Sequence, residues 1–393
     1  MTSSAERMRD YTGPAILTYG FRPFFLFGAL WAALAVAVWL PVLSGHVGLP
    51  SAFAPIDWHV HELVYGYVPA IVAGFLLTAV PNWTGCLPIV GTPLLALFMT
   101  WIAGRVAVFF SRYTGAPTAA AIDLLFLTAL GAVIAREIVA GRSWRNLKVL
   151  GGVALLLVGN GLFHLESVTG LGNGNGARLG IGASVLLITL IGGRIVPSFT
   201  RNWLARREPG RLPAPFDRFD ASTMAVTGLA LAIWIAMPDA IATAPFSLAA
   251  GALNVVRLCR WAGERTAAEP LVLILHVGYA FVPVGFVLLA LAILRPEFVT
   301  SSGAVHGWTA GAIGVMTLAV MTRASLGHTG RPLTATAPVQ LIYAAALVAA
   351  LARIIAAFGV LREAMLHVSA AAWVLAFAGF VFVYGPLLWR HRA

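Results

Sequence analysis

Long apolar stretches, each about twenty residues long and almost free of charge, recur along the chain and restrict it to one kind of fold. An α-helix of about 20 residues crosses a bilayer core of about 30 Å while satisfying its own backbone hydrogen bonds. Hydrophobic residues make up 60% of the 393 residues and charged residues only 10%. A soluble domain carries about a quarter charged residues. The sequence therefore predicts an all-α, polytopic integral membrane protein.

We expect about twelve transmembrane helices, separated by short polar turns. The predicted helices cover residues 24–43, 59–80, 88–110, 118–139, 147–169, 178–199, 221–237, 241–261, 270–294, 304–322, 335–358 and 366–389. The predicted domains are a cytoplasmic segment at residues 1–23, a single transmembrane domain at 24–389 and a cytoplasmic tail at 390–393. A basic, proline-bearing loop at about 200–220 separates two halves that share no evident repeat, so an inverted-repeat transporter is not supported.

Basic residues indicate how the chain is oriented. Most of the 26 lysine and arginine residues fall on the cytoplasmic side if the N-terminus is cytoplasmic, while Arg105 lies within a span. This asymmetry follows the positive-inside rule, so we expect both termini in the cytoplasm. The same rule accounts for the net charge of +11, which in a soluble protein would suggest a nucleic-acid partner. The expected partner is the lipid bilayer, and no nucleic acid is expected.

The second predicted span opens on a polar group, WHVHE, which begins at Trp58. Imidazole and carboxylate at the mouth of a lipid-buried helix cost free energy unless something coordinates or pairs them. His59 and His61 lie two residues apart, or about 200° around a helix. A regular helix therefore cannot direct both at one metal. Glu62 is expected to accept a hydrogen bond from an imidazole and to fix its tautomer.

Six of the nine histidines fall where a bundle of helices could use them as metal ligands. The predicted topology puts His59, His61, His164 and His306 near the outer face, and His276 and His328 in the inner half. His306 and His328 are separated by about 33 Å of helix and cannot share a site if that helix is continuous. Neutral imidazole is a common ligand for haem iron, copper and zinc. Interfacial hydrogen bonding is the alternative role for each histidine, and it is the one we expect for His46, His367 and His391.

A second polar cluster is expected on the inner side. Arg194 lies near the end of the sixth span and Arg323 near the end of the tenth, both close to the membrane. Their guanidinium groups could pair with haem propionates or with a bound anion. The alternative is that both arginines anchor the topology by extending their charged ends to the interface.

Seven segments resemble the NnrS family, whose members are haem- and copper-containing membrane proteins linked to the response to nitric oxide. The segments are YGFRPFFLFGALWAALA at Tyr19, WHVHE at Trp58, GFLLTAVPNWTG at Gly74, GNGLFHLE at Gly159, IGGRIVPSFTRN at Ile191, LHVGYAFVPVGF at Leu275 and HGWTAGAIGVMTLAVMTRASLGHTGRPL at His306. The resemblance implies a location in a bacterial inner membrane, in a denitrifying or otherwise NO-exposed cell. It also implies that the six histidines above bind metal.

The resemblance further implies two cofactors, copper and haem. No Cys-x-x-Cys-His sequence occurs, so the haem is expected to be non-covalent and b-type. The residues expected at the cofactors, besides the histidines, are Glu62, Asn82, Trp83, Arg194, Thr200, Asn202 and Arg323.

Haem-copper oxidases and nitric oxide reductases offer a weaker, fold-level comparison. Their core also has twelve spans, with haem histidines on the second and tenth. Here His59 or His61 lies on the second predicted span and His306 on the tenth. However, the chain has neither an adjacent His-His pair nor a His-x-His sequence on the tenth span, which argues against a complete oxidase-type centre.

Two classes of function remain open from the sequence. The first is a haem/copper protein that handles nitric oxide by binding or redox chemistry, with an electron donor as a further partner. The second is a metal or haem transporter or assembly factor, in which histidines pass the cargo along. The first class predicts a Soret band that shifts when nitric oxide is added, whereas the second predicts a colourless protein that carries copper into vesicles.

Overall fold

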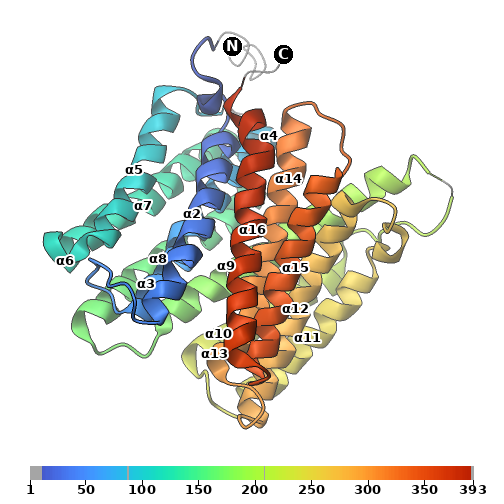
Figure 1. The fold of residues 1–393 in the computed structure, drawn as a ribbon. Helices are drawn as coiled ribbons and strands as arrows, with labels where there is room; N and C mark the ends of the chain where they lie inside the picture. Colours follow the sequence, from blue (N-terminus) through green and yellow to red (C-terminus); the bar gives the residue numbers. More distant parts are fainter. Residues whose placement is uncertain (1–10, 86–87, 208, 391–393) are drawn as a thin grey trace. The chain divides into compact units, whose positions relative to one another are not determined.

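The computed structural model describes residues 11–85, 88–207 and 209–390, and within these ranges the chain is helical and contains no strand (Figure 1). Cys86 and His391 lie outside the described residues. Cys259 is exposed as a free thiol.

Eleven helices among the described residues are long and apolar enough to cross a membrane. They are α2 (Phe21–Leu43), the α3–η2–α4 rod (Pro55–His61, Glu62–Tyr67, Val68–Thr84), α5 (Thr92–Phe109), α7 (Ala116–Ala140), α8 (Leu147–Thr169), α9 (Asn175–Leu204), α10 (Arg218–Ala236), α12 (Pro270–Leu294), the α13–η5–α14 rod (Ser301–Ala304, Gly307–Val315, Met316–His328), α15 (Ala337–Ala357) and α16 (Arg362–Trp389). The shorter elements are η1 (Ala15–Leu17), α6 (Ser111–Thr114), η3 (Trp144–Asn146), α11 (Thr243–Cys259) and η4 (Gly263–Arg265).

The predicted class, an all-α polytopic membrane protein, is confirmed. Eleven of the predicted spans correspond to the long helices, and the remaining one corresponds to α11, an apolar helix of 17 residues. At about 1.5 Å per residue, α11 is about 25 Å long and therefore shorter than a typical bilayer core.

Local chemistry explains several helix ends. The left-handed glycines Gly85 and Gly170, with φ values of 72° and 65°, end α4 and α8 in a conformation that favours glycine. At the start of α10, the Asp217 carboxylate accepts hydrogen bonds from the backbone N–H groups of Phe219 and Asp220. Hydrogen bonding from Arg260 lowers the pKa of Asp217 to about 2. This cap is therefore ionised at neutral pH and favours the positive end of the helix dipole.

The described chain forms two compact units. Unit 1 contains the N-terminal part of the chain up to Ala183 together with the end of α16 from Phe377, and unit 2 runs from Ser184 to Ala376. In unit 1, α2 packs against α4, α5 against α7, α7 against α8, and α3 against α8. In unit 2, α11 packs against α10 and α12, while η5 packs against α12 and α15. The packing in unit 1 brings together the end of α3, the first half of α7 and the second half of α8.

Two of the predicted metal histidines stand directly before π-helical turns. His61 precedes η2, and His306 precedes η5. A π-helical turn contains an extra residue relative to an α-helix, and such turns are frequent at functional sites. The two π-helical turns lie in the second and tenth predicted spans, in which the sequence predicts His61 and His306 as metal ligands.

Candidate metal centre

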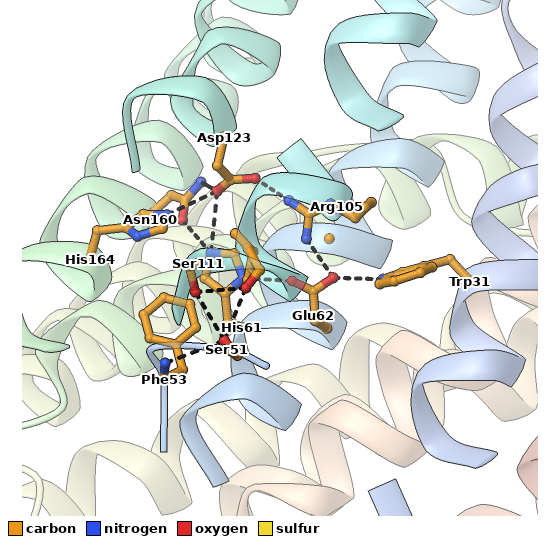
Figure 2. Close-up of polar contacts among 12 residues, drawn as sticks. Trp31, Ser51, Phe53, His61, Glu62, Arg105, Ser111, Asp123, Asn160 and His164 are labelled. Carbon is orange, nitrogen blue, oxygen red and sulfur yellow. Dashed lines mark hydrogen bonds and ion pairs between the residues drawn. The ribbon is translucent and has the colours of Figure 1, made fainter. Parts of the chain in front are cut away.

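His61 is the last residue of α3, and its side chain is fully buried in unit 1. Its Nδ1 atom lies 3.0 Å from Glu62 Oε1. A carboxylate only accepts hydrogen bonds, so this ring nitrogen carries the hydrogen and donates it to Glu62. The predicted contact between Glu62 and an imidazole is therefore present (Figure 2).

The other ring nitrogen of His61 faces side chains from α7 and α8. Its Nε2 atom lies 3.2 Å from Asp123 Oδ2 and 3.0 Å from Asn160 Oδ1. Asn160 Nδ2 donates to the same Asp123 oxygen at 2.7 Å, which fixes the amide with its carbonyl oxygen toward His61. His164, one helical turn beyond Asn160 on α8, places its Nε2 atom 3.1 Å from Asp123 Oδ2.

This geometry leaves His61 Nε2 opposite two oxygen acceptors. Because Nδ1 already carries the hydrogen that is donated to Glu62, a neutral imidazole turns the Nε2 lone pair toward the lone pairs of Asp123 and Asn160. The negative charge density of these lone pairs makes the nitrogen and oxygen atoms repel each other, and burial strengthens the repulsion. A cation at this point, either a proton or a metal ion, removes the conflict. His61, Asp123 and His164 each offer one ligand atom, and these atoms lie within 4.8 Å of one another.

Arg105, from α5, connects the two carboxylates of the cluster. Its guanidinium donates to Glu62 Oε2 at 2.7 Å and also to Asp123 Oδ1. Trp31 Nε1 donates to Glu62 Oε2 at 2.8 Å. With both imidazoles neutral, the two carboxylates and one guanidinium give the buried cluster a net charge of −1. One added positive charge would neutralise it.

Aromatic rings and a loop held by hydrogen bonds enclose the cluster. The Phe53 ring lies 4.9 Å from the His61 ring and 5.4 Å from the His164 ring, and Phe163 lies 5.4 Å from His61. The loop that carries Phe53 is held by Ser51, whose Oγ atom bonds to Val108 O at 3.0 Å. These apolar rings lower the local dielectric, which strengthens the interactions among the charged groups.

Glycine makes room for the ion pair. A Cβ atom at Gly66, in η2, would lie 2.4 Å from Arg105 Nη1 and 2.9 Å from Glu62 Oε2. Gly66→Ala should therefore displace the guanidinium and reduce the free energy of unfolding by about 1–3 kcal/mol. The melting temperature of the purified protein should fall accordingly. Gly151→Ala in α8 is the control, because nothing lies within 4 Å of its Cβ position and alanine favours helix. Equal melting temperatures for the two variants would contradict this assignment.

The other histidines that the sequence analysis expects near the outer face have neighbours of their own. The ring of His59 stacks on Trp39, with centroids 4.5 Å apart and planes inclined by 15°. His59 and His61 thus face different neighbours. His306 belongs to unit 2, and its Nδ1 atom lies 2.8 Å from Ser302 O. His46 is exposed, and the exposed His367 bonds through Nδ1 to Glu363 O at 2.9 Å.

His276, in α12 of unit 2, has an arrangement typical of a metal-ligating imidazole. Its Nε2 atom lies 2.8 Å from Thr200 Oγ1, and that hydroxyl donates its own hydrogen to Val196 O at 2.8 Å. When the hydroxyl donates to Val196 O, His276 Nε2 carries the hydrogen of the second contact and the lone pair lies on Nδ1. Nδ1 is buried and has no hydrogen-bond partner. Gly263 faces this atom, and a Cβ atom there would lie 2.6 Å from it.

The other predicted cofactor residues are dispersed. His328 ends α14 and is exposed, so the chain after Thr322 does not fold back as a loop but remains helical. The Arg323 guanidinium lies 4.2 Å over the Phe199 ring. Arg194 and Asn202 are exposed on α9. Asn82 bonds locally to Thr78 O, and Trp83 contacts Phe75 edge to face.

Sequence reasoning did not identify Asp123, Asn160, Arg105 or Trp31 as site residues. Asp123 and Arg105 nevertheless carry a signal, because each is a lone charge in the apolar part of its span. A charge within a membrane span marks a functional site by default. Asn160 lies in the segment GNGLFHLE, one helical turn before His164. An amide on the same helical face as a buried histidine is the sequence signal for its place in the site.

The fold and the cluster together define a polytopic membrane protein with a buried His/Asp site that could hold a metal ion. The family model described as NnrS protein matches residues 15–392, nearly the whole chain. The chain therefore belongs to the NnrS family. No curated protein matches the sequence.

Proposed function

We propose that the protein binds copper through His61, Asp123 and His164 and uses it to handle nitric oxide in the membrane. The observation that carries the proposal is the position of His61 Nε2, which faces only the oxygen acceptors of Asp123 and Asn160. A metal ion there would convert opposed lone pairs into ligands.

The donor atoms suit a first-row transition metal. Atoms bound at about 2.0–2.2 Å around a tetrahedral ion lie about 3.3–3.6 Å apart. The two imidazole nitrogens lie 3.1 Å and 3.2 Å from Asp123 Oδ2, so small side-chain shifts would complete the coordination. Among the divalent ions of this series, copper binds such sites most tightly. A single positive charge, as on Cu(I), would also make the cluster electrically neutral.

The groups around the ligands have definite roles in this proposal. Glu62 accepts the Nδ1 hydrogen of His61 and keeps the Nε2 lone pair available for the metal. Arg105 balances the charge of the two carboxylates and fixes their orientation. The surrounding rings of Phe53 and Phe163 keep water away from the site.

Haem is proposed at His276, in unit 2. Its Nδ1 atom is buried and has no hydrogen-bond partner, and Gly263 packs so closely against this atom that the segment around Gly263 would have to move for haem to bind. Thr200 receives the Nε2 hydrogen, as neighbours of metal-bound imidazoles usually do. The b-type haem, and a role for Arg323 or Arg194 at its propionates, remain predictions from the resemblance.

Family membership supports nitric oxide as the small molecule. Copper or haem iron, when bound, would supply a redox-active centre with affinity for this gas. Nitric oxide is apolar and dissolves in the bilayer, where the cluster lies. An electron donor is a further predicted partner, and a transporter or assembly factor is the second function that the sequence leaves open.

The absorption spectrum and metal content of the purified protein test the proposal. We expect about one copper per chain and a Soret band that shifts with nitric oxide. His61→Ala should lose copper and keep the Soret band, whereas His276→Ala should do the reverse. A colourless chain that moves copper into vesicles would favour the transporter, and loss of the same single cofactor in both variants would contradict two centres.

Glu62→Gln tests the supporting role of the carboxylate. The amide can still receive a hydrogen bond from His61 but lacks the charge that raises the basicity of the imidazole. We expect copper affinity to fall about 10–100-fold while the protein still folds. Competition with a copper chelator of known affinity measures the change. Glu363→Gln, at an exposed position on α16, should leave the affinity unaltered, and an equal effect of the two substitutions would argue against the role of Glu62.

The orientation in a bacterial inner membrane, with both termini in the cytoplasm, is proposed from the distribution of basic residues. Reporter domains fused after residue 212, in the loop between α9 and α10, should be active only as cytoplasmic reporters. Export of a periplasmic reporter from that position would overturn the orientation.

A further inference from the structure

The loop between α9 and α10 concentrates arginine at the edge of the membrane. From residue 201 to residue 218 the chain has five arginines and two acidic residues, Glu208 and Asp217. All five arginines are exposed. Because α9 ends at Leu204 and α10 begins at Arg218, and both helices are long and apolar enough to cross the membrane, the loop starts and finishes at the level of the lipid headgroups.

Hydrogen bonds hold this loop against the turn between α11 and α12, in the same unit of the chain. Arg201 donates to Pro213 O within the loop. Arg211 donates to the carboxylate of Glu264 at 2.7 Å, and Arg265 Nη1 donates to Arg211 O at 2.6 Å. The loop is therefore folded back toward the helix ends, and these three arginines have structural partners.

The other three arginines of the loop have a different environment. Among the described residues, Arg206, Arg207 and Arg218 form no ion pair with a carboxylate. The guanidinium of Arg207 lies 4.1 Å over the ring of Trp203. A stacked guanidinium keeps its N–H groups at its edge, where they can donate to phosphate oxygens in pairs. Tryptophan itself is typical of the headgroup level of a membrane.

Exposed apolar side chains lie between these arginines in the sequence. Phe216 is 60% exposed and Leu212 is 41% exposed. Apolar side chains beside basic ones are typical of surfaces that insert into the headgroup and acyl boundary of a bilayer. An acidic soluble protein would satisfy the arginines alone, whereas a phospholipid offers a phosphate and an apolar chain together.

We propose that this loop binds the headgroup of an anionic phospholipid. Arg206, Arg207 and Arg218 contact the phosphate, while Leu212 and Phe216 contact the apolar part of the lipid. Basic residues next to a membrane-spanning helix attract anionic lipids in this way. The proposal involves residues of unit 2 only and does not depend on the metal centre in unit 1.

Native mass spectrometry of the full chain in detergent tests the inference. The probes are dioleoylphosphatidylglycerol, which is anionic, and dioleoylphosphatidylcholine, which is zwitterionic and has the same acyl chains. We expect the anionic lipid to bind about 100-fold more tightly, and the triple variant Arg206→Gln/Arg207→Gln/Arg218→Gln to lose this preference. Each single substitution should reduce the preference about fivefold, so the test does not require the triple variant to fold.

Three controls separate a lipid site from general surface charge. Arg142→Gln/Arg145→Gln/Lys148→Gln removes three exposed charges around the turn between α7 and α8, and should keep the preference. Phe216→Ala should weaken both lipids about fivefold without changing the preference. Glycerol 3-phosphate, a headgroup without acyl chains, should not compete. Equal binding of the two lipids by the natural protein, equal loss in the two triple variants, or effective competition by glycerol 3-phosphate would overturn the proposal.

Discussion

Replacing His61 by alanine is expected to lower the affinity of the purified protein for copper by more than about 100-fold. Residues that only support metal ligands typically contribute about 10–100-fold, and a ligand contributes more. His61 is also the residue on which the cluster converges, since its two ring nitrogens contact Glu62, Asp123 and Asn160. Chelator competition, followed by metal analysis after dialysis, measures the loss.

The control for this experiment is His367→Ala. His367 is exposed, and its Nδ1 atom lies 2.9 Å from the backbone oxygen of Glu363 in the same helix. The circular dichroism of both variants should match that of the natural protein, which separates loss of metal from loss of fold. Full copper content in His61→Ala, or equal loss in His367→Ala, would show that copper binds elsewhere.

Replacing Arg105 by leucine should produce the largest loss of stability. The substitution leaves the carboxylates of Glu62 and Asp123 buried without their cation. Removing one partner from a buried charge network costs about 3–5 kcal/mol in the free energy of unfolding. Thermal unfolding in detergent should show a strongly lowered melting temperature, and the yield of folded protein should fall with it.

A double variant identifies the cause of that loss. Adding Glu62→Gln to Arg105→Leu removes one of the two carboxylates left without a cation. The double variant should therefore lose less free energy of unfolding than the two single variants lose together. Arg112→Leu, at an exposed position just after α5, should have little effect. If Arg105→Leu melts like Arg112→Leu, the network around Glu62 and Asp123 does not stabilise the protein as described.

The fold was predictable because apolar length alone specifies membrane helices. The spans expected at 147–169 and 270–294 coincide with α8 and α12. The sequence did not reveal that the eighth span is shorter than a bilayer core. Nor did it reveal the π-helical turns after His61 and His306, since π turns depend on packing around the helix rather than on residue type.

The site was predictable only in part. Histidine and glutamate at the mouth of the second span pointed to His61 and Glu62, and a histidine within an apolar run pointed to His164, because polar groups in lipid require compensation. Their shared partner, Asp123, depends on how α7 packs against α8, and no pattern within one helix specifies that contact. The expectation that His306 binds a metal stays a prediction, and its Nδ1 atom lies 2.8 Å from Ser302 O.

X-ray absorption at the copper edge of the purified full-length protein tests the central proposal most directly. We predict one tightly bound copper with nitrogen and oxygen neighbours at about 2.0–2.2 Å, including the scattering pattern of two imidazole rings. His164→Ala should reduce that pattern to one imidazole or release the metal. Copper with sulfur neighbours, or a spectrum that is the same in the natural protein and in the His61→Ala and His164→Ala variants, would contradict a centre formed by His61, Asp123 and His164.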